Sequence, residues 1–359
     1  MSSNLKNEYV VEYDILRVCT IFLVVFGHSD FLYSHKFSVC NSIPETLQAY
    51  VIDYSSIRPW IYSFHMPLFM LLSGALFSIT YNNYSPAEYF KNRFFRLMVP
   101  YITCGILFAI PIKWIVGYFG NYSLMWAYVQ SLVFIISPGH LWFLWVLFVI
   151  NLFFYYLASK SKLNWRVLFC LVLLNFVSLC GIGWFQIFRL LEYPLYFYLG
   201  YIFEVGGLRK KVISCFRQTS QNKQIIMTLM TFIFTILMIV FTRFIVMPNL
   251  ILHLIGIVQA LIGSAFMFLI SMNFAISADF LQGHLYKISK KWNFSIYLYH
   301  EPLQFLLLWI LAKTDVLRYF NNNGMYIVLC ILRFLLTIST SIFIGRTVSA
   351  VKKITIFNL

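Results

Sequence analysis

Ten apolar runs recur along this chain of 359 residues, and they constrain its fold more than any other feature. An α-helix needs about 20 mostly apolar residues to cross the hydrocarbon core of a bilayer. Hydrophobic side chains make up 61% of the sequence and charged ones only 11%, a balance foreign to soluble globular domains. We therefore predict an all-α, multi-pass integral membrane protein with about ten transmembrane helices. The predicted spans are 14–33, 60–80, 97–119, 141–159, 166–185, 187–205, 224–247, 250–276, 290–313 and 325–347.

The net charge of +15 is explained by where the basic residues lie. Eighteen of the 27 Lys and Arg residues fall in one alternate set of loops and tails, as expected of segments that face the cytoplasm. Both termini are therefore predicted to be cytoplasmic. The basic charge then faces membrane lipids, and no nucleic-acid partner is expected. The eighteen are Lys6; Lys91, Arg93 and Arg96; Lys160, Lys162 and Arg166; Arg209, Lys210, Lys211, Arg217 and Lys223; Lys287, Lys290 and Lys291; and Arg346, Lys352 and Lys353.

The segments between the runs are too short to form a soluble domain. We expect a single membrane domain over residues 1–359 with no fused soluble domain. A cleaved signal peptide is not expected, because the first run is interrupted by polar residues and has no small-residue cleavage site. The seven cysteines lie far apart without CxxC spacing, so we expect neither a disulfide framework nor a metal site.

The first span carries ionisable residues at both ends: Asp14 and Arg17 near its start, and His28 towards its end. Eleven residues separate Arg17 from His28, about three helical turns, so both lie on nearly one face and roughly 16 Å apart in depth. Arg17 can instead reach the headgroups, and His28 can be an interhelical hydrogen bonder. Because ionisable groups at membrane depth are costly and usually mark a functional path, three on one helix favour a site.

Two further histidines fall near the outer ends of predicted spans. His65 lies about five residues inside the second span, and an outer loop joins that span to the first, so His65 and His28 share a depth of roughly 7 Å. His140 precedes Trp142 at the outer mouth of the fourth span. Imidazole suits general base chemistry near neutral pH. The alternatives stay open: His65 as a polar contact between helices, and His140 as an interfacial loop residue.

Arg93 and Arg96 lie one helical turn apart at the predicted cytoplasmic edge of the third span. Two guanidinium groups at i and i+3 can hold a phosphate together, although a topology anchor is the alternative for this pair. In the ninth span, Ser295, Tyr299 and His300 can line an interior.

Glu301, which follows His300 at mid-membrane, needs a partner there. Arg333 and the Arg189–Glu192 pair are the candidates. Stacked by depth, the polar groups form a column that suits an anionic cytoplasmic donor whose reactive end is used across the membrane.

The sequence resembles the acyltransferase 3 family of polytopic acyltransferases. Its Arg-x10-His motif corresponds to Arg17 and His28, and its Arg-x-x-Arg motif to Arg93 and Arg96. The segments FHMPLFMLLSG, GHLWFL and SIYLYHEPL are most similar to the branch around fucose 4-O-acetylases. The resemblance implies ten core helices, acetyl-CoA as donor with no tightly bound cofactor, and a sugar hydroxyl of a surface glycan or its lipid-linked precursor as acceptor. It also implies the bacterial cytoplasmic (inner) membrane.

Two functions are open at this stage. In an O-acetyltransferase, Arg93 and Arg96 would bind the CoA phosphates and Arg17 would place the thioester arm. His28 would be a general base or a transient acyl carrier, while His65 would orient His28 or stabilise the oxyanion. Asp14, His140, Trp142, Ser295, Tyr299 and His300 are candidate pocket-lining residues. The alternative is a transporter or flippase of a lipid-linked sugar, which would neither bind nor hydrolyse acetyl-CoA.

Overall fold

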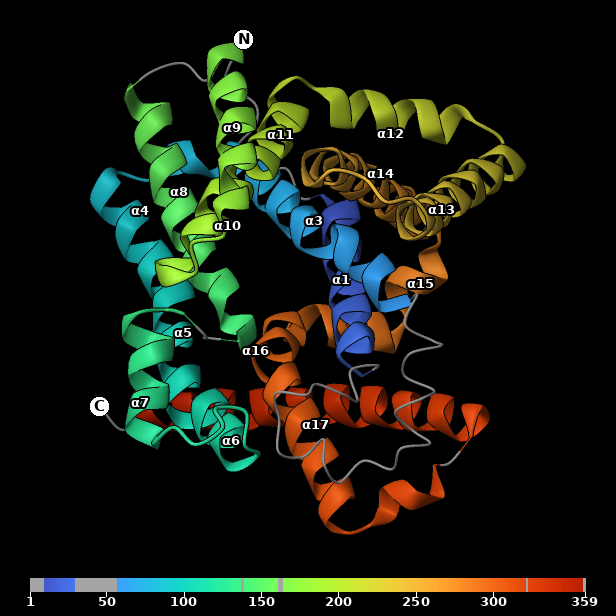
Figure 1. Ribbon diagram of the computed structural model, residues 1–359. Helices are drawn as coiled ribbons and strands as arrows, with labels where there is room; N and C mark the ends of the chain where they lie inside the picture. Colours follow the sequence, from blue (N-terminus) through green and yellow to red (C-terminus); the bar gives the residue numbers. More distant parts are fainter. Residues whose placement is uncertain (1–9, 30–56, 137–138, 161–163, 321, 358–359) are drawn as a thin grey trace. The chain divides into compact units, whose positions relative to one another are not determined.

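The computed structural model describes residues 10–29, 57–136, 139–160, 164–320 and 322–357, and their regular elements are all helical (Figure 1). Among these residues, six helices are long and apolar enough to cross a membrane. The prediction of an all-α membrane protein is therefore confirmed, while the count of ten spans and the side of each terminus stay predictions. The six are Ile57–Asn83, Pro86–Ile115, Gly139–Ser159, Gln221–Thr242, Asn249–Ile276 and Gly324–Val351.

The four other predicted spans also coincide with helices, but these are short, broken or polar. The first is α1 (Val11–Ser29), and the ninth lies within α16 (His284–Lys313). The fifth is covered by α9 (Trp165–Val177) with η7 (Ser178–Cys180), and the sixth by α10 (Ile187–Glu192) and α11 (Pro194–Val205). Pro194 breaks the helix between α10 and α11, since it has no N–H to donate.

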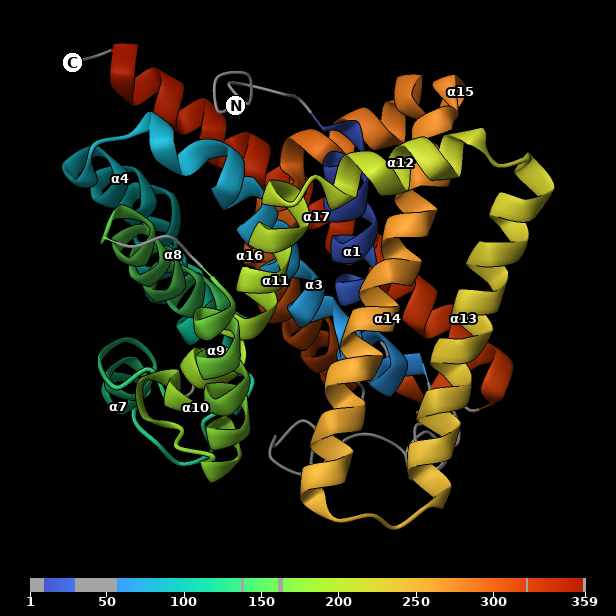
Figure 2. The same cartoon turned by 90° about the horizontal axis from the view of Figure 1, so that it is seen from above.

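The chain divides into two compact units, which are described separately. Unit one comprises residues 1–20, 62–101 and 141–283, and unit two comprises residues 21–61, 102–140 and 284–359. Within unit one, α13 and α14 pack side by side as an antiparallel pair, and α12 runs across their ends (Figure 2). Besides α9 to α11, unit one contains the first part of α1, most of α3 (Ile57–Thr80), η2 (Tyr81–Asn83), α4 (Pro86–Arg93), η3 (Phe94–Met98), the start of α5 (Val99–Cys104), α8 (Trp142–Lys160), η8 (Trp184–Gln186), α12 (Leu208–Gln218), α13 (Gln221–Phe244), α14 (Asn249–Ile276) and α15 (Ala278–Gln282).

Glycines let the helices of unit one approach to backbone contact. A Cβ on Gly74 of α3 would overlap the main chain of Phe197 in α11, and one on Gly200 of α11 would overlap the main chain of Leu71. Gly263 of α14 packs in the same way against the ring of Phe64. Close approach through small residues is a common source of helix association in membranes.

We expect Gly74→Ala to destabilise the protein by about 1–3 kcal/mol, because the added methyl group meets backbone that cannot rotate away. Gly256→Ala in α14 is the control, since no atom lies within 4 Å of a Cβ at that position. Thermal unfolding in detergent measures both variants. Equal stability of the two would show that α3 and α11 can separate without cost.

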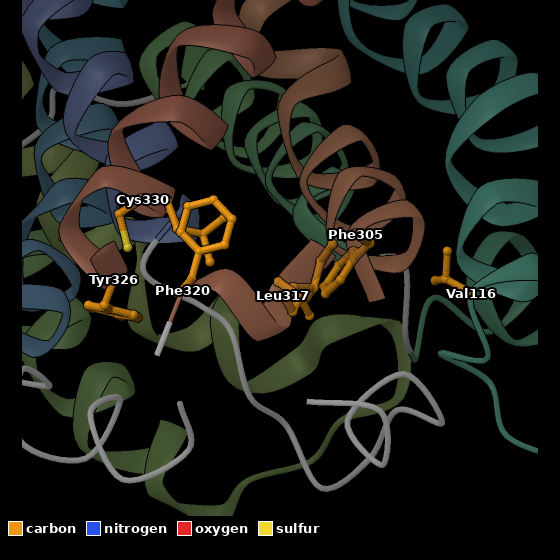
Figure 3. Packing of buried hydrophobic residues seen from close by; sticks show 8 residues of the cluster. Val116, Phe305, Leu317, Phe320, Tyr326 and Cys330 are labelled. Carbon is orange, nitrogen blue, oxygen red and sulfur yellow. The ribbon is translucent and has the colours of Figure 1, made fainter. Parts of the chain in front are cut away.

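In unit two, α16 packs against α17 (Asn323–Phe357) over an apolar cluster that also includes Val116 and η9 (Val316–Tyr319) (Figure 3). Gly345 of α17 allows this contact, because a Cβ there would meet the side chain of Ser295. The cluster fixes the position of α16. The turns of this helix that come before Phe305 carry the polar residues described below. The other elements of unit two are the end of α1, the first turn of α3, the end of α5, η4 (Gly105–Ala109), α6 (Ile110–Ile115), α7 (Leu124–Tyr128), η5 (Val129–Val133) and η6 (Gly139–Leu141).

The helix from Pro86 to Ile115 contains two π-helical turns, η3 and η4. A π turn closes hydrogen bonds from i to i+5 and is frequent at functional sites. Arg93 ends α4 and Arg96 lies in η3, so the two guanidinium groups are separated by a wide turn. The two side chains therefore lie further apart around the helix axis than they would in the regular α-helix that the sequence predicts.

The predicted topology is testable by labelling. In a variant without native cysteines, a cysteine at Asn121 should react with a membrane-impermeant reagent added outside the cell, and one at Gln221 should not. Both positions are exposed and lie on opposite sides of the membrane in the charge-based topology. The reverse pattern would place Arg93 and Arg96 away from the cytoplasm.

Candidate active site

Three histidines of unit two meet ring to ring. His300 of α16 lies between His28, at the end of α1, and His140 in η6, with 5.0 Å between ring centroids on each side. His300 and His140 are buried, while His28 is only partly buried. Among the three histidines, His28 is therefore the least buried.

A buried ion pair supports this cluster from behind. Glu301, the neighbour of His300, lies 2.5 Å from Lys113 Nζ and 2.7 Å from His140 Nδ1 through the same Oε2 atom. Only 2% of the Lys113 side chain is exposed. Removing two charges from water is costly, so such a pair persists only where close partners compensate each charge.

The hydrogen-bond contacts of the buried His140 and His300 rings bear on which ring nitrogens carry protons. His140 Nδ1 faces the Glu301 carboxylate, and its Nε2 lies 2.9 Å from Leu298 O, so both contacts are hydrogen bonds only when both ring nitrogens carry a proton. In His300, Nδ1 donates to Tyr297 O at 2.7 Å, and Nε2 has no hydrogen-bond partner among the described residues. A His300 ring that carries its single proton on Nδ1 therefore presents an unprotonated Nε2.

The end of α1 is held by a second buried network. Ser29 accepts a hydrogen bond on its Oγ from Gln304 Nε2 at 2.7 Å, and its carbonyl accepts one from Arg333 Nη1 at 2.7 Å. Arg333 also donates to Gln304 O at 3.3 Å. Because Ser29 follows His28 directly, these bonds tie the position of the His28 ring to α16 and α17.

Gly139 is required by this arrangement in two ways. Its φ of +59° is in the left-handed region, and a Cβ would overlap Lys113 Nζ and come close to Glu301 Oε2. The glycine of the GHLWFL segment therefore leaves room for the ion pair.

The contacts of His140 and Glu301 bear on the alternatives that the sequence left open. His140 is buried and lies against Glu301, while its depth in the membrane, and with it the interfacial alternative, stays a prediction. Glu301 pairs with Lys113 and His140, and neither Arg333 nor the Arg189–Glu192 pair supplies its charge partner among the described contacts. Lys113 was not predicted, although a lysine within an apolar run is itself a signal of a buried ion pair.

The other candidates on α16 face different neighbours. Tyr299 packs edge-on against Phe108 with 5.0 Å between ring centroids, and Ser295 lies against Gly345 of α17. Neither side chain is part of the histidine cluster, and their role as pocket-lining residues stays a prediction.

The remaining sequence-predicted residues belong to unit one. Arg17 Nη1 lies 3.7 Å from Asp14 Oδ1 at the start of α1, and 40% of the Arg17 side chain is exposed. His65 is buried with its ring 4.8 Å from that of Tyr62. The predicted pairing of His65 with His28 stays a prediction, because the two residues belong to different units.

Trp142 and Arg93 also lie in unit one, and each takes part in a contact between a cation and an aromatic ring. The Arg189 guanidinium lies 4.0 Å above the Trp142 ring, which stacks on Tyr193. Arg93 lies 4.8 Å from the ring of Tyr89, and Arg96 is exposed. Arg96 is therefore accessible to a ligand, while Arg93 lies against the ring of Tyr89.

A model of the family described as an acyltransferase domain, Acyl_transf_3, matches residues 10–343. The chain belongs to the acyltransferase 3 family. The resemblance to this family is thereby confirmed, and the protein is a multi-pass membrane acyltransferase. This membership favours the enzyme over a transporter or flippase. No curated protein and no solved structure matches the chain.

Proposed function

We propose that this acyltransferase moves an acetyl group from cytoplasmic acetyl-CoA to a sugar hydroxyl of a bacterial surface glycan or its lipid-linked precursor. The inner membrane is its proposed location, and the branch around fucose 4-O-acetylases its proposed subfamily. The observation that supports the chemistry is the contact of the partly buried His28 ring with His300, whose ring in turn contacts His140.

In the direct mechanism, the acceptor hydroxyl gives its proton to His28 while its oxygen attacks the thioester carbonyl carbon. Collapse of the tetrahedral intermediate breaks the carbon–sulfur bond, and the proton passes from the ring to the leaving CoA sulfur. In the covalent alternative, the unprotonated His28 nitrogen attacks the thioester carbonyl, the carbon–sulfur bond breaks, and CoA leaves as the thiol with the proton of the other ring nitrogen. The acceptor hydroxyl then attacks the acyl-imidazole, the carbon–nitrogen bond breaks, and the hydroxyl proton returns to the His28 ring.

The buried groups favour either route by electrostatics. The Lys113 ammonium and the His140 ring lie against one carboxylate, behind the His300 ring that contacts His28. Positive charge there stabilises the oxyanion that develops on the thioester carbonyl. Arg17 and His65 are proposed to place the thioester arm and to orient His28, respectively.

We expect the double variant Arg93→Ala with Arg96→Ala to bind acetyl-CoA roughly tenfold or more weakly, because charge-assisted hydrogen bonds to phosphate are lost. Lys91→Ala with Arg166→Ala removes the same charge from the same predicted face and is the control. Calorimetry on the detergent-solubilised protein measures both. Equal affinity in the two double variants would return Arg93 and Arg96 to topology anchors.

The function itself is tested on the glycan. Surface glycan from cells with and without the chain is compared by mass and NMR, with the His28→Gln variant as the inactive match. One acetyl group per modified sugar should appear only with the unaltered chain. Identical glycans in all strains, together with no thioester hydrolysis of acetyl-CoA by the purified protein, would refute acetyl transfer.

A further inference from the structure

Unit one contains a cavity of about 610 Å³ that the proposed chemistry does not use. One wall is a single face of α12, which contributes Arg209, Lys210, Ser214 and Arg217. Their spacing of i, i+1, i+5 and i+8 places them along two adjacent ridges of the helix. The facing walls come from the start of α1, the end of α14 and α15.

Cations line the cavity, and the charge of one of them, Arg209, is already paired with a carboxylate. Arg209 is buried, and its Nε donates to both oxygens of Glu204 at 3.0 Å, while Tyr13 donates to Glu204 Oε2 at 2.6 Å. Arg217 Nη2 donates to Glu12 at 3.0 Å across the cavity. This single bond orients the Arg217 guanidinium, which has four further N–H groups.

Lys210 and Arg217 suit a tetrahedral anion, whereas the Ser214 hydroxyl already donates to Lys211 O at 3.0 Å. The two cations lie two helical turns apart with a hydroxyl between them, and all three line the same space. Ile213 and Leu281 add apolar wall beside them. A basic pocket with an apolar side at the end of membrane helices is the kind of site that binds phosphate headgroups.

We propose that this cavity binds a phosphate group of an amphiphile or nucleotide. The same chemistry is offered by the headgroup of an anionic phospholipid and by the phosphates of coenzyme A. For the phospholipid the inference is independent of the proposed acetyl transfer, whereas for coenzyme A it rests on that function. Phosphate binding is measured without acceptor and without turnover, so the two can fail separately.

The test compares two charge-matched double variants of the full chain. Lys210→Gln with Arg217→Gln removes both cations from the cavity, and the glutamine amide that replaces the Arg217 guanidinium can still donate to Glu12. Lys211→Gln with Lys223→Gln removes two exposed cations nearby that do not line it. Retained phosphatidylglycerol is counted by native mass spectrometry from nanodiscs, with phosphatidylcholine nanodiscs as the blank, and coenzyme A affinity is measured by calorimetry.

We expect the cavity variant to lose retained phosphatidylglycerol if the ligand is a lipid, or to bind coenzyme A roughly tenfold more weakly if it is a nucleotide. The control variant should match the unaltered protein in both measurements. If the two variants behave alike in both, the cavity binds no phosphate. If the double variant does not fold, Ser214→Asp repeats the comparison, because it adds a negative charge inside the cavity. Cys215→Asp is its control, since Cys215 does not line the cavity.

Discussion

His28→Gln is expected to lower the rate of acetyl transfer by roughly 100- to 10,000-fold, the usual loss when a general base is removed. Glutamine keeps much of the volume and hydrogen-bonding capacity of histidine, so the variant should fold, insert and bind acetyl-CoA. The rate is measured as acetyl incorporation into glycan, and binding is measured separately by calorimetry. Loss of rate with unchanged donor affinity is the expected combination.

The matched control is His253→Gln in α14, which removes a half-buried histidine whose Nε2 lies 2.7 Å from Asn175 Oδ1 in unit one. Its rate should stay close to that of the unaltered protein. A rapid quench without acceptor distinguishes the two routes, since only the covalent route leaves one acetyl group on the chain. If His28→Gln transfers acetyl at a normal rate, the chemistry belongs to His65 or His300.

Glu301→Gln should destabilise the protein by about 3–5 kcal/mol, because it leaves the buried Lys113 charge without its counter-charge. It should also slow acetyl transfer, since His140 loses the carboxylate that holds its ring in place. Thermal unfolding and the transfer rate are measured on the same preparation.

Adding Lys113→Met to Glu301→Gln separates these two effects. With both members of the pair removed, most of the lost stability should return, because no uncompensated charge stays buried. The transfer rate should not return, because His140 still lacks its carboxylate. A cost below about 1 kcal/mol for Glu301→Gln alone would mean that water reaches the pair.

Much of the fold follows from hydrophobic patterning. A run of about 20 apolar residues has few stable alternatives to a membrane helix, so the positions of the long helices were predictable from the sequence. The region of α9 to α11 was harder to divide, because its helices end at Gly181 and restart through left-handed residues at Phe185 and Gln186. Such breaks leave only weak signals in an apolar segment.

The sequence indicated which residues belong to the candidate site better than it indicated which of them pair with one another. His28, His140 and His300 are polar residues in apolar surroundings and are visible as such in the sequence. The partner of Glu301 was not visible, because it depends on which face α6 turns towards α16. Sequence spacing gives the direction of a side chain only where the helix is regular.

The π turn η4 decides which face of α6 lies towards α16. Cys104, before the turn, donates its thiol to Leu298 O of α16 at 3.4 Å, and Lys113, after it, lies 2.5 Å from Glu301 of the same helix. At about 100° per residue, nine residues of regular α-helix would put these two positions on opposite sides. The wider turn lets both meet one neighbour, so the buried ion pair depends on a single extra residue in the helix and not only on which amino acids are present. A related chain without that extra residue would carry its lysine away from the carboxylate, even with every charged side chain preserved.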